Sequence, residues 1–250
     1  MQSVLFSFLA GVSTVLGVFV LLLFGRPSKR VLAGLLGFAG GIMIAISLFE
    51  LIPESVDFAG VPGAALGFVL GVALMFTVDR TAPHAHVYSP ESLEVENPAH
   101  APASRNPLMR TGYLVLFGIA LHNLPEGVAI GAGLESSPKL GLAVAVAIAL
   151  HNIPEGLAIG GPLRSGGLGI GRIILLTLAA GLMTPVGAII GQLFFNISEA
   201  FVGGALAFAA GAMIYIVLDE LVPNANKLHP HWANIGINFA ILLGFILFLL

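Results

Sequence analysis

The chain has 250 residues, of which 57% are apolar and only 9% are charged, and its net charge is −3. Soluble domains are about half apolar and about a quarter charged, so this composition excludes a water-soluble globule as well as a disordered chain. It predicts an all-α integral membrane protein. The lack of a basic block argues against nucleic acid as a partner, and the lack of cysteine excludes thiolate metal sites.

Eight apolar runs reach the ~20 residues that a transmembrane helix needs. Short linkers with Gly or Pro separate most of them, and we expect the whole of 1–250 to form a single transmembrane domain. The eight predicted helices are roughly 3–24, 31–55, 60–79, 111–134, 139–160, 169–195, 198–225 and 231–250.

The linker 80–110 is longer than the others and is rich in Pro, Ser and Glu, without an apolar period. Such a composition predicts a mobile loop. The loop carries three histidines beside three glutamates, which could hold a metal loosely or could simply be solvated, and the sequence leaves both interpretations open. These histidines are His84, His86 and His100.

Basic residues predict the orientation, because Lys and Arg are enriched in cytoplasmic segments. With the N-terminus outside, nine of the ten basic residues fall in inner segments, and only Lys139 lies outside. This count predicts two extracytoplasmic termini, an even number of helices and a cytoplasmic loop at about 80–110.

Two internal repeats are visible in the sequence. IALHNLPEGVAIG at 119–131 matches IALHNIPEGLAIG at 148–160 in 11 of 13 positions, at an offset of 29. GIMIAISLFELIP at 41–53 resembles GAMIYIVLDELVP at 211–223, at an offset of 170. In the predicted topology each pair is antiparallel, as in the inverted-topology repeats of secondary transporters, whose substrate sites lie near the membrane centre.

The first repeat places ionisable groups about halfway along two predicted helices. Such groups cost at least ~2.5–3.5 kcal/mol each at the centre of a membrane helix, so their presence there requires an explanation. Histidine and glutamate four residues apart share one helix face, and the asparagine lies on its flank. Two copies that face each other would bring together His122, Asn123, Glu126, His151, Asn152 and Glu155.

Two prolines add to this constellation, because Pro125 and Pro154 leave the carbonyls of Leu121 and Leu150 without their helical donors. Imidazole and carboxylate ligands suit Zn²⁺, and also Fe²⁺, Mn²⁺, Co²⁺ or Cd²⁺, whereas Ca²⁺ and Mg²⁺ prefer oxygen alone. A proton relay built from the same residues is an alternative that can coexist with metal transport.

Acidic residues of the second repeat are a weaker signal. Glu50 and Glu220 are equivalent in that repeat, and Asp219 precedes Glu220. They could form the entrance and exit of a cation path, or they could solvate the helix ends.

The paired motifs HNLPEG at 122–127 and HNIPEG at 151–156 resemble those of the ZIP family of divalent metal transporters, in its short prokaryotic branch. The resemblance implies eight helices in a 3+2+3 arrangement and uptake of zinc through a binuclear centre between the fourth and fifth helices. It assigns His122, Glu126, His151 and Glu155 to one metal, and both asparagines with the same glutamates to the other. Thr184 stands where the family usually has a further glutamate, which predicts one tight site and, at most, one weak site. The resemblance also places Asp219 and Glu220 on the inner exit route.

We therefore expect a multi-pass protein of the prokaryotic plasma membrane that moves Zn²⁺, and also Fe²⁺, Mn²⁺ or Cd²⁺, into the cytoplasm. Its partners are the metal ion and the lipid bilayer, and a homodimer is left open. Two other functions use the same residues. An intramembrane zinc hydrolase would keep one metal position for water, although no HExxH motif occurs. A metal sensor would bind zinc and move none.

Overall fold

The computed structural model of the protein describes residues 2–25, 28–81, 84–85, 95–96, 107–195 and 199–249, and the side chain of His122 lies outside this description. Nearly all of these residues are helical, which confirms the all-α prediction. The helices are α1 (Gln2–Phe24), α2 (Lys29–Ile46), α3 (Ile52–Thr81), α4 (Pro107–Ser136), α5 (Pro138–Ser165), α6 (Ile170–Gly181), α7 (Met183–Phe195), α8 (Glu199–Ile216), α9 (Val222–Leu228) and α10 (Pro230–Leu249).

The segment between α3 and α4 was predicted to be a loop. Within it the structure places two short strands, β1 (His84–Ala85) and β2 (Val95–Glu96), which pair antiparallel. His86, His100 and the side chain of His84 lie outside the description, so the two interpretations of the loop histidines, a loose metal site or solvated side chains, stay untested.

Six stretches of the described chain are long and apolar enough to cross a membrane, which indicates a multi-pass membrane protein. One of them, Lys29–Arg80, has 52 residues. A helix of that length would measure about 78 Å, more than twice the ~30 Å hydrocarbon core. Gly60 interrupts it with a φ of 65°, a left-handed conformation that glycine adopts without strain. Pro230–Ile246 is a shorter apolar helix.

Three of the predicted helices are interrupted. Two π-helical turns, η1 (Ser47–Leu51) and η3 (Val217–Leu221), occupy equivalent positions of the repeat at offset 170. The predicted helix 169–195 is divided at Leu182 into α6 and α7. Periodicity does not reveal such breaks, because the apolar composition continues through them.

Glycine allows neighbouring parallel helices to pack backbone to backbone. In α4 a Cβ on Gly127 would lie 1.9 Å from the carbonyl oxygen of Thr184, and on Gly131 2.3 Å from that of Ala188. The contacts advance by four residues along both helices, so α4 and α7 are parallel. The same pattern joins α1 to α5, α2 to α10 and α3 to α8 through Gly17, Gly37 and Gly71.

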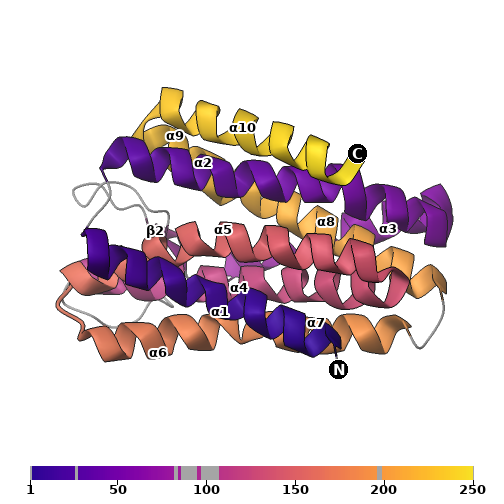
Figure 1. Cartoon of the computed structure of the whole chain (residues 1–250), viewed down its shortest axis with the longest axis horizontal. Coiled ribbons are helices and arrows are strands. Elements are labelled where there is room, and N and C mark those ends of the chain that lie inside the picture. The colour runs from indigo at the N-terminus through magenta and orange to yellow at the C-terminus, as the bar shows by residue number, and fades with distance from the viewer. Residues whose placement is uncertain are drawn as a thin grey trace.

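The helices form layers, with α4 and α5 in the middle (Figure 1). The layer of α1, α6 and α7 covers one side, and the other side contains α2 with α10. The two sides meet where α2 packs against α5 and α8 packs against α4. The first helix begins and the last helix ends at the same end of the bundle, the right-hand end of Figure 1.

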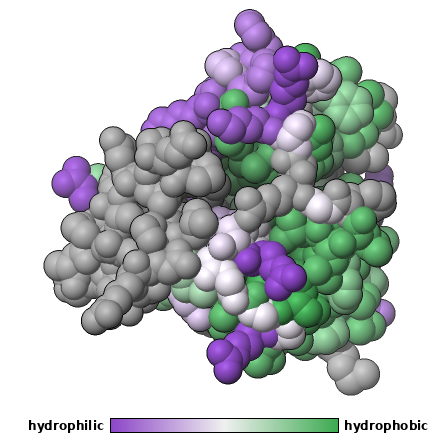
Figure 2. All heavy atoms as spheres, turned by 90° about the vertical axis from the view of Figure 1, so that its left-hand side faces the viewer, coloured by the Kyte–Doolittle hydropathy of each residue, from purple (hydrophilic) through white to green (hydrophobic). Residues whose placement is uncertain are grey.

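The opposite end of the bundle carries hydrophilic residues, whereas hydrophobic residues cover much of the adjoining side (Figure 2). Large apolar side chains such as Leu66, Leu175 and Phe239 are more than half exposed on the helices. In water such a surface would be unfavourable, but in a bilayer it faces hydrocarbon.

Candidate metal centre

The centre lies where the two helices that carry the HNxPEG motifs pack together. α4 and α5 form an antiparallel hairpin, because contacts join Gly141 to Leu134 near the turn and Gly112 to Leu163 near the other end. This confirms that the two HNxPEG segments run in opposite directions. Pro125 and Pro154 lie inside these helices, one residue before the two glutamates.

The convergence of imidazole and carboxylate groups is confirmed for three residues. Glu126, His151 and Glu155 each offer a ligand atom, and these atoms lie within 4.8 Å of one another. All three side chains are essentially inaccessible, at 0%, 0% and 1% exposed. Nε2 of His151 lies 2.9 Å from Oε1 of Glu126, a hydrogen bond between the two helices.

Most of the ligand atoms in this cluster have no protein partner among the described residues. They are Oε2 of Glu126, Nδ1 of His151 and both carboxylate oxygens of Glu155. An unsatisfied buried polar group costs about 1–3 kcal/mol, and a charged group costs more. Two buried carboxylates at this distance repel each other, and a divalent cation between them would relieve both problems.

The asparagines flank the cluster, as the repeat predicted, and their amides tie it to neighbouring helices. Nδ2 of Asn123 donates to the carbonyl oxygen of Ala180 at 2.9 Å, and Nδ2 of Asn152 donates to that of Ala10 at 2.9 Å. Because both amides donate from nitrogen, each Oδ1 is left as an acceptor, and neither has a partner within the described part of the chain.

The two asparagine contacts reveal an extension of the repeat that sequence reasoning missed. Ala10 and Ala180 differ by 170, the offset that relates 41–53 to 211–223. At this offset AGVSTVLG, 10–17, matches AGLMTPVG, 180–187, in the alanine, the glycine after it, the threonine and the last glycine. A search of the N-terminal helix at the known offset would have found the match, although four identities in eight residues are a weak signal by themselves.

Thr184 lies beside the centre. It is fully buried, and its Oγ1 has no partner among the residues described. Its backbone carbonyl approaches Gly127, directly after Glu126. The equivalent residue Thr14 approaches Gly156 in the same way, and its Oγ1 donates to the carbonyl of Gly11 at 2.9 Å.

The acidic residues of the π-helical turns lie in different surroundings. Glu220 lies within electrostatic reach of Glu155. A Cβ added to Gly118 of α4 would lie 3.8 Å from Oε1 of Glu220. Asp219 lies near the Tyr215 hydroxyl. Glu50 instead interacts electrostatically with Glu54 and Lys139. Glu220 is therefore associated with the centre, and Glu50 belongs to a separate charged group.

These features define a class: a multi-pass helical membrane protein with a buried nitrogen and oxygen ligand set between inverted copies of one segment. Comparison with known proteins identifies the family. Residues 85–250 match the family model described as ZIP Zinc transporter. The chain is 37% identical over 227 residues to proteins named Zinc transporter ZupT from Salmonella newport (strain SL254) and Escherichia fergusonii, covering 89% of this chain and 86% of theirs. The chain belongs to the ZIP zinc transporter family, which confirms the family resemblance of the paired motifs.

Proposed function

We propose that this protein carries Zn²⁺ across the cell membrane of a prokaryote into the cytoplasm, and that the cluster of Glu126, His151 and Glu155 binds the ion in transit. The observation that supports this proposal is the convergence of three buried ligand residues, most of whose ligand atoms have no partner among the described residues. The two carboxylates balance the charge of a divalent cation. Because the family is one of transporters and not of enzymes, the hydrolase alternative is set aside.

The asparagine oxygens and His122 complete the proposed ligand set. Asn123 and Asn152 are held by their amide nitrogens, so Oδ1 of each is free to coordinate or to bind a water on the metal. The mixture of imidazole and oxygen ligands also suits Fe²⁺, Mn²⁺ and Cd²⁺, which we propose as further substrates.

We propose eight membrane crossings with both termini outside the cytoplasm. The 52-residue stretch provides two crossings when it is divided at Gly60, and α6 with α7 provides one. The stretches of α1, α4, α5 and α8 provide one crossing each, and α10 brings the total to eight. The parallel packing of α1 with α5 and of α4 with α7 agrees with this alternation, because each pair then crosses in the same direction. The end opposite the termini contains most of the basic residues and is assigned to the cytoplasm.

A single tightly bound zinc ion is proposed because Thr184, which packs against the segment that carries Glu126, has a neutral hydroxyl where a carboxylate would strengthen a second site. Release to the cytoplasm would pass Glu220 and Asp219, since Glu220, which lies outside the cluster, is within electrostatic reach of Glu155. Glu50, at the equivalent turn near the other end, would serve the entrance.

Uptake of ⁶⁵Zn²⁺ into proteoliposomes tests the proposal. The wild type should accumulate zinc, and His151→Ala and Glu155→Gln should reduce uptake to the level of empty vesicles. Glu135→Gln is the matched control, because Glu135 lies on α4 and accepts a hydrogen bond from Gln192 that the glutamine oxygen can keep. Binding of zinc without uptake by the wild type would favour a sensor instead. Competition by Fe²⁺, Mn²⁺ and Cd²⁺ tests the further substrates.

A further inference from the structure

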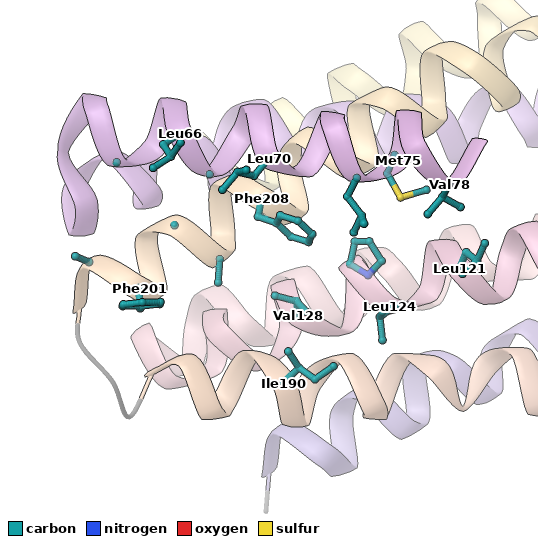
Figure 3. A pocket seen from close by; sticks show the side chains of 17 residues that line it. Leu66, Leu70, Met75, Val78, Leu121, Leu124, Val128, Ile190, Phe201 and Phe208 are labelled. Atoms are coloured by element: carbon teal, nitrogen blue, oxygen red, sulfur yellow. The ribbon is translucent and has the colours of Figure 1, made fainter. Parts of the chain in front are cut away.

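A long apolar groove opens on the surface between α3 and α8 on one side and α4 and α7 on the other (Figure 3). Its volume is about 710 Å³, and every residue that lines it is apolar. Leu66 and Leu70 on its rim are 63% and 53% exposed, whereas Val128 and Ala205 in its floor are 4% and 7% exposed. The groove is therefore open outward and closed at its base.

The groove is elongated in the direction of the helices. Its lining residues on α3 extend from Gly63 to Val78, which corresponds to about 22 Å at ~1.5 Å per residue. One leaflet of a bilayer has about 15 Å of hydrocarbon, half of the ~30 Å core. A ligand that fills this space must be long, narrow and apolar.

We propose that the groove binds an acyl chain of a membrane phospholipid. It lies within stretches that are apolar enough to cross the membrane, where water is scarce and hydrocarbon is the solvent. An empty groove of this size would forfeit the dispersion contacts of its lining atoms. The lining offers no polar side chain that would select a polar ligand.

The bound chain would contact the back of the kinked segment that carries Glu126. Pro125 lines the groove, and so does Leu121, whose carbonyl loses its helical donor to that proline. The facing wall comes from α3 and α8, and Figure 3 shows Phe208 and Leu70 opposite Leu124 and Val128. The acyl chain thus lies between helices of both sides of the bundle, next to the metal centre.

Quenching of tryptophan emission by phospholipids with brominated acyl chains tests this site. The chain has one tryptophan, Trp232, so Trp232→Phe gives a silent background. Phe208→Trp places a reporter on α8 in the groove, Leu70→Trp provides a second reporter on α3 in the same wall, and Phe239→Trp reports on bulk lipid. Gly204→Phe then blocks the groove. No described atom lies within 4 Å of a Cβ added there, so the substitution fits. Gly171→Phe is the control, since Gly171 on α6 is equally open.

Brominated lipid should quench Phe208→Trp as strongly as Phe239→Trp. Gly204→Phe should weaken the quenching at Phe208→Trp and Leu70→Trp but not at Phe239→Trp, and Gly171→Phe should change none of them. Weak quenching at Phe208→Trp, or quenching that Gly204→Phe leaves unchanged, would overturn the proposal. If brominated lipid fails to quench Phe208→Trp and light scattering shows a dimer, the groove is covered by a second copy of the chain and not by lipid. No metal is needed, so the outcome is independent of zinc transport.

Discussion

Gly11 and Gly181 are equivalent residues of the inverted repeat, and their backbones touch each other. A Cβ on Gly11 would lie 2.0 Å from the carbonyl oxygen of Gly181, and a Cβ on Gly181 would lie 2.2 Å from that of Gly11. A contact between a residue and its own repeat equivalent marks the pseudo-two-fold axis. That axis also relates Glu126 to Glu155, so the metal centre is built around the symmetry of the fold.

Alanine at either glycine should destabilise the protein, because the obstructing atoms are backbone and cannot rotate away. Overpacking of this kind costs about 1–3 kcal/mol. Thermal unfolding in detergent should show a lower Tm for Gly11→Ala and for Gly181→Ala. Gly171→Ala meets no atom within 4 Å in the described structure and should leave the Tm within error. Equal stability of all three variants would contradict the close approach.

Replacing one ligand carboxylate should weaken zinc binding far more than it changes stability. Loss of an outer partner of a metal ligand already costs about 10–100-fold in affinity, so Glu126→Gln and Glu155→Gln should each lose more than about 100-fold. Isothermal titration should also give one tightly bound zinc ion in the wild type. Two tight sites would contradict the role assigned to Thr184.

The two asparagines should behave alike, because each donates one hydrogen bond of 2.9 Å to an equivalent alanine carbonyl. Asn123→Ala and Asn152→Ala each remove one buried hydrogen bond, a loss of about 0.5–1.5 kcal/mol, because each carbonyl keeps another donor, the amide of Leu182 for Ala180 and the hydroxyl of Ser13 for Ala10. Chemical unfolding should give similar losses for the two variants. A large difference between them would show that only one copy of the repeat keeps this contact.

Zinc affinity should fall as the pH is lowered, because protons compete with the metal for imidazole and carboxylate groups. The ligands bind metal only when they are deprotonated. The zinc affinity therefore rises with pH until the ligands have lost their protons. Equilibrium binding of ⁶⁵Zn²⁺ measured at several pH values checks this. An affinity independent of pH from mildly acid to neutral would argue against histidine as a ligand.

The orientation can be tested directly, since the natural chain has no cysteine. Single cysteines at Val61 and Ser137, near the end with the termini, should react in intact cells with a reagent that cannot cross the membrane. Cysteines at Gly169, which has an ordinary φ of −66°, and at Leu228 should react only after the cells are permeabilised. The reverse pattern would invert the proposed direction of transport.

Much of this arrangement follows from the sequence because polar residues are rare in it. Glu126, His151 and Glu155 stand out against apolar neighbours, and their duplication at a fixed offset predicted that they meet. Composition and length likewise predicted an all-helical membrane fold.

Other features depend on packing that no local pattern encodes. The amides of Asn123 and Asn152 reach α6 and α1, contacts that only the three-dimensional structure reveals. The π-helical turns at Glu50 and Glu220 leave the apolar periodicity intact, so periodicity cannot detect them. The surroundings of these two glutamates also differ although their sequences repeat, since each lies against a different neighbour.

The most direct test of the central claim is anomalous scattering at the zinc edge from crystals of the zinc-loaded protein. The account predicts one strong peak at about 2.0–2.2 Å from ligand atoms of Glu126, His151 and Glu155, between the proline-containing segments of α4 and α5. A zinc ion bound away from these three side chains would contradict it.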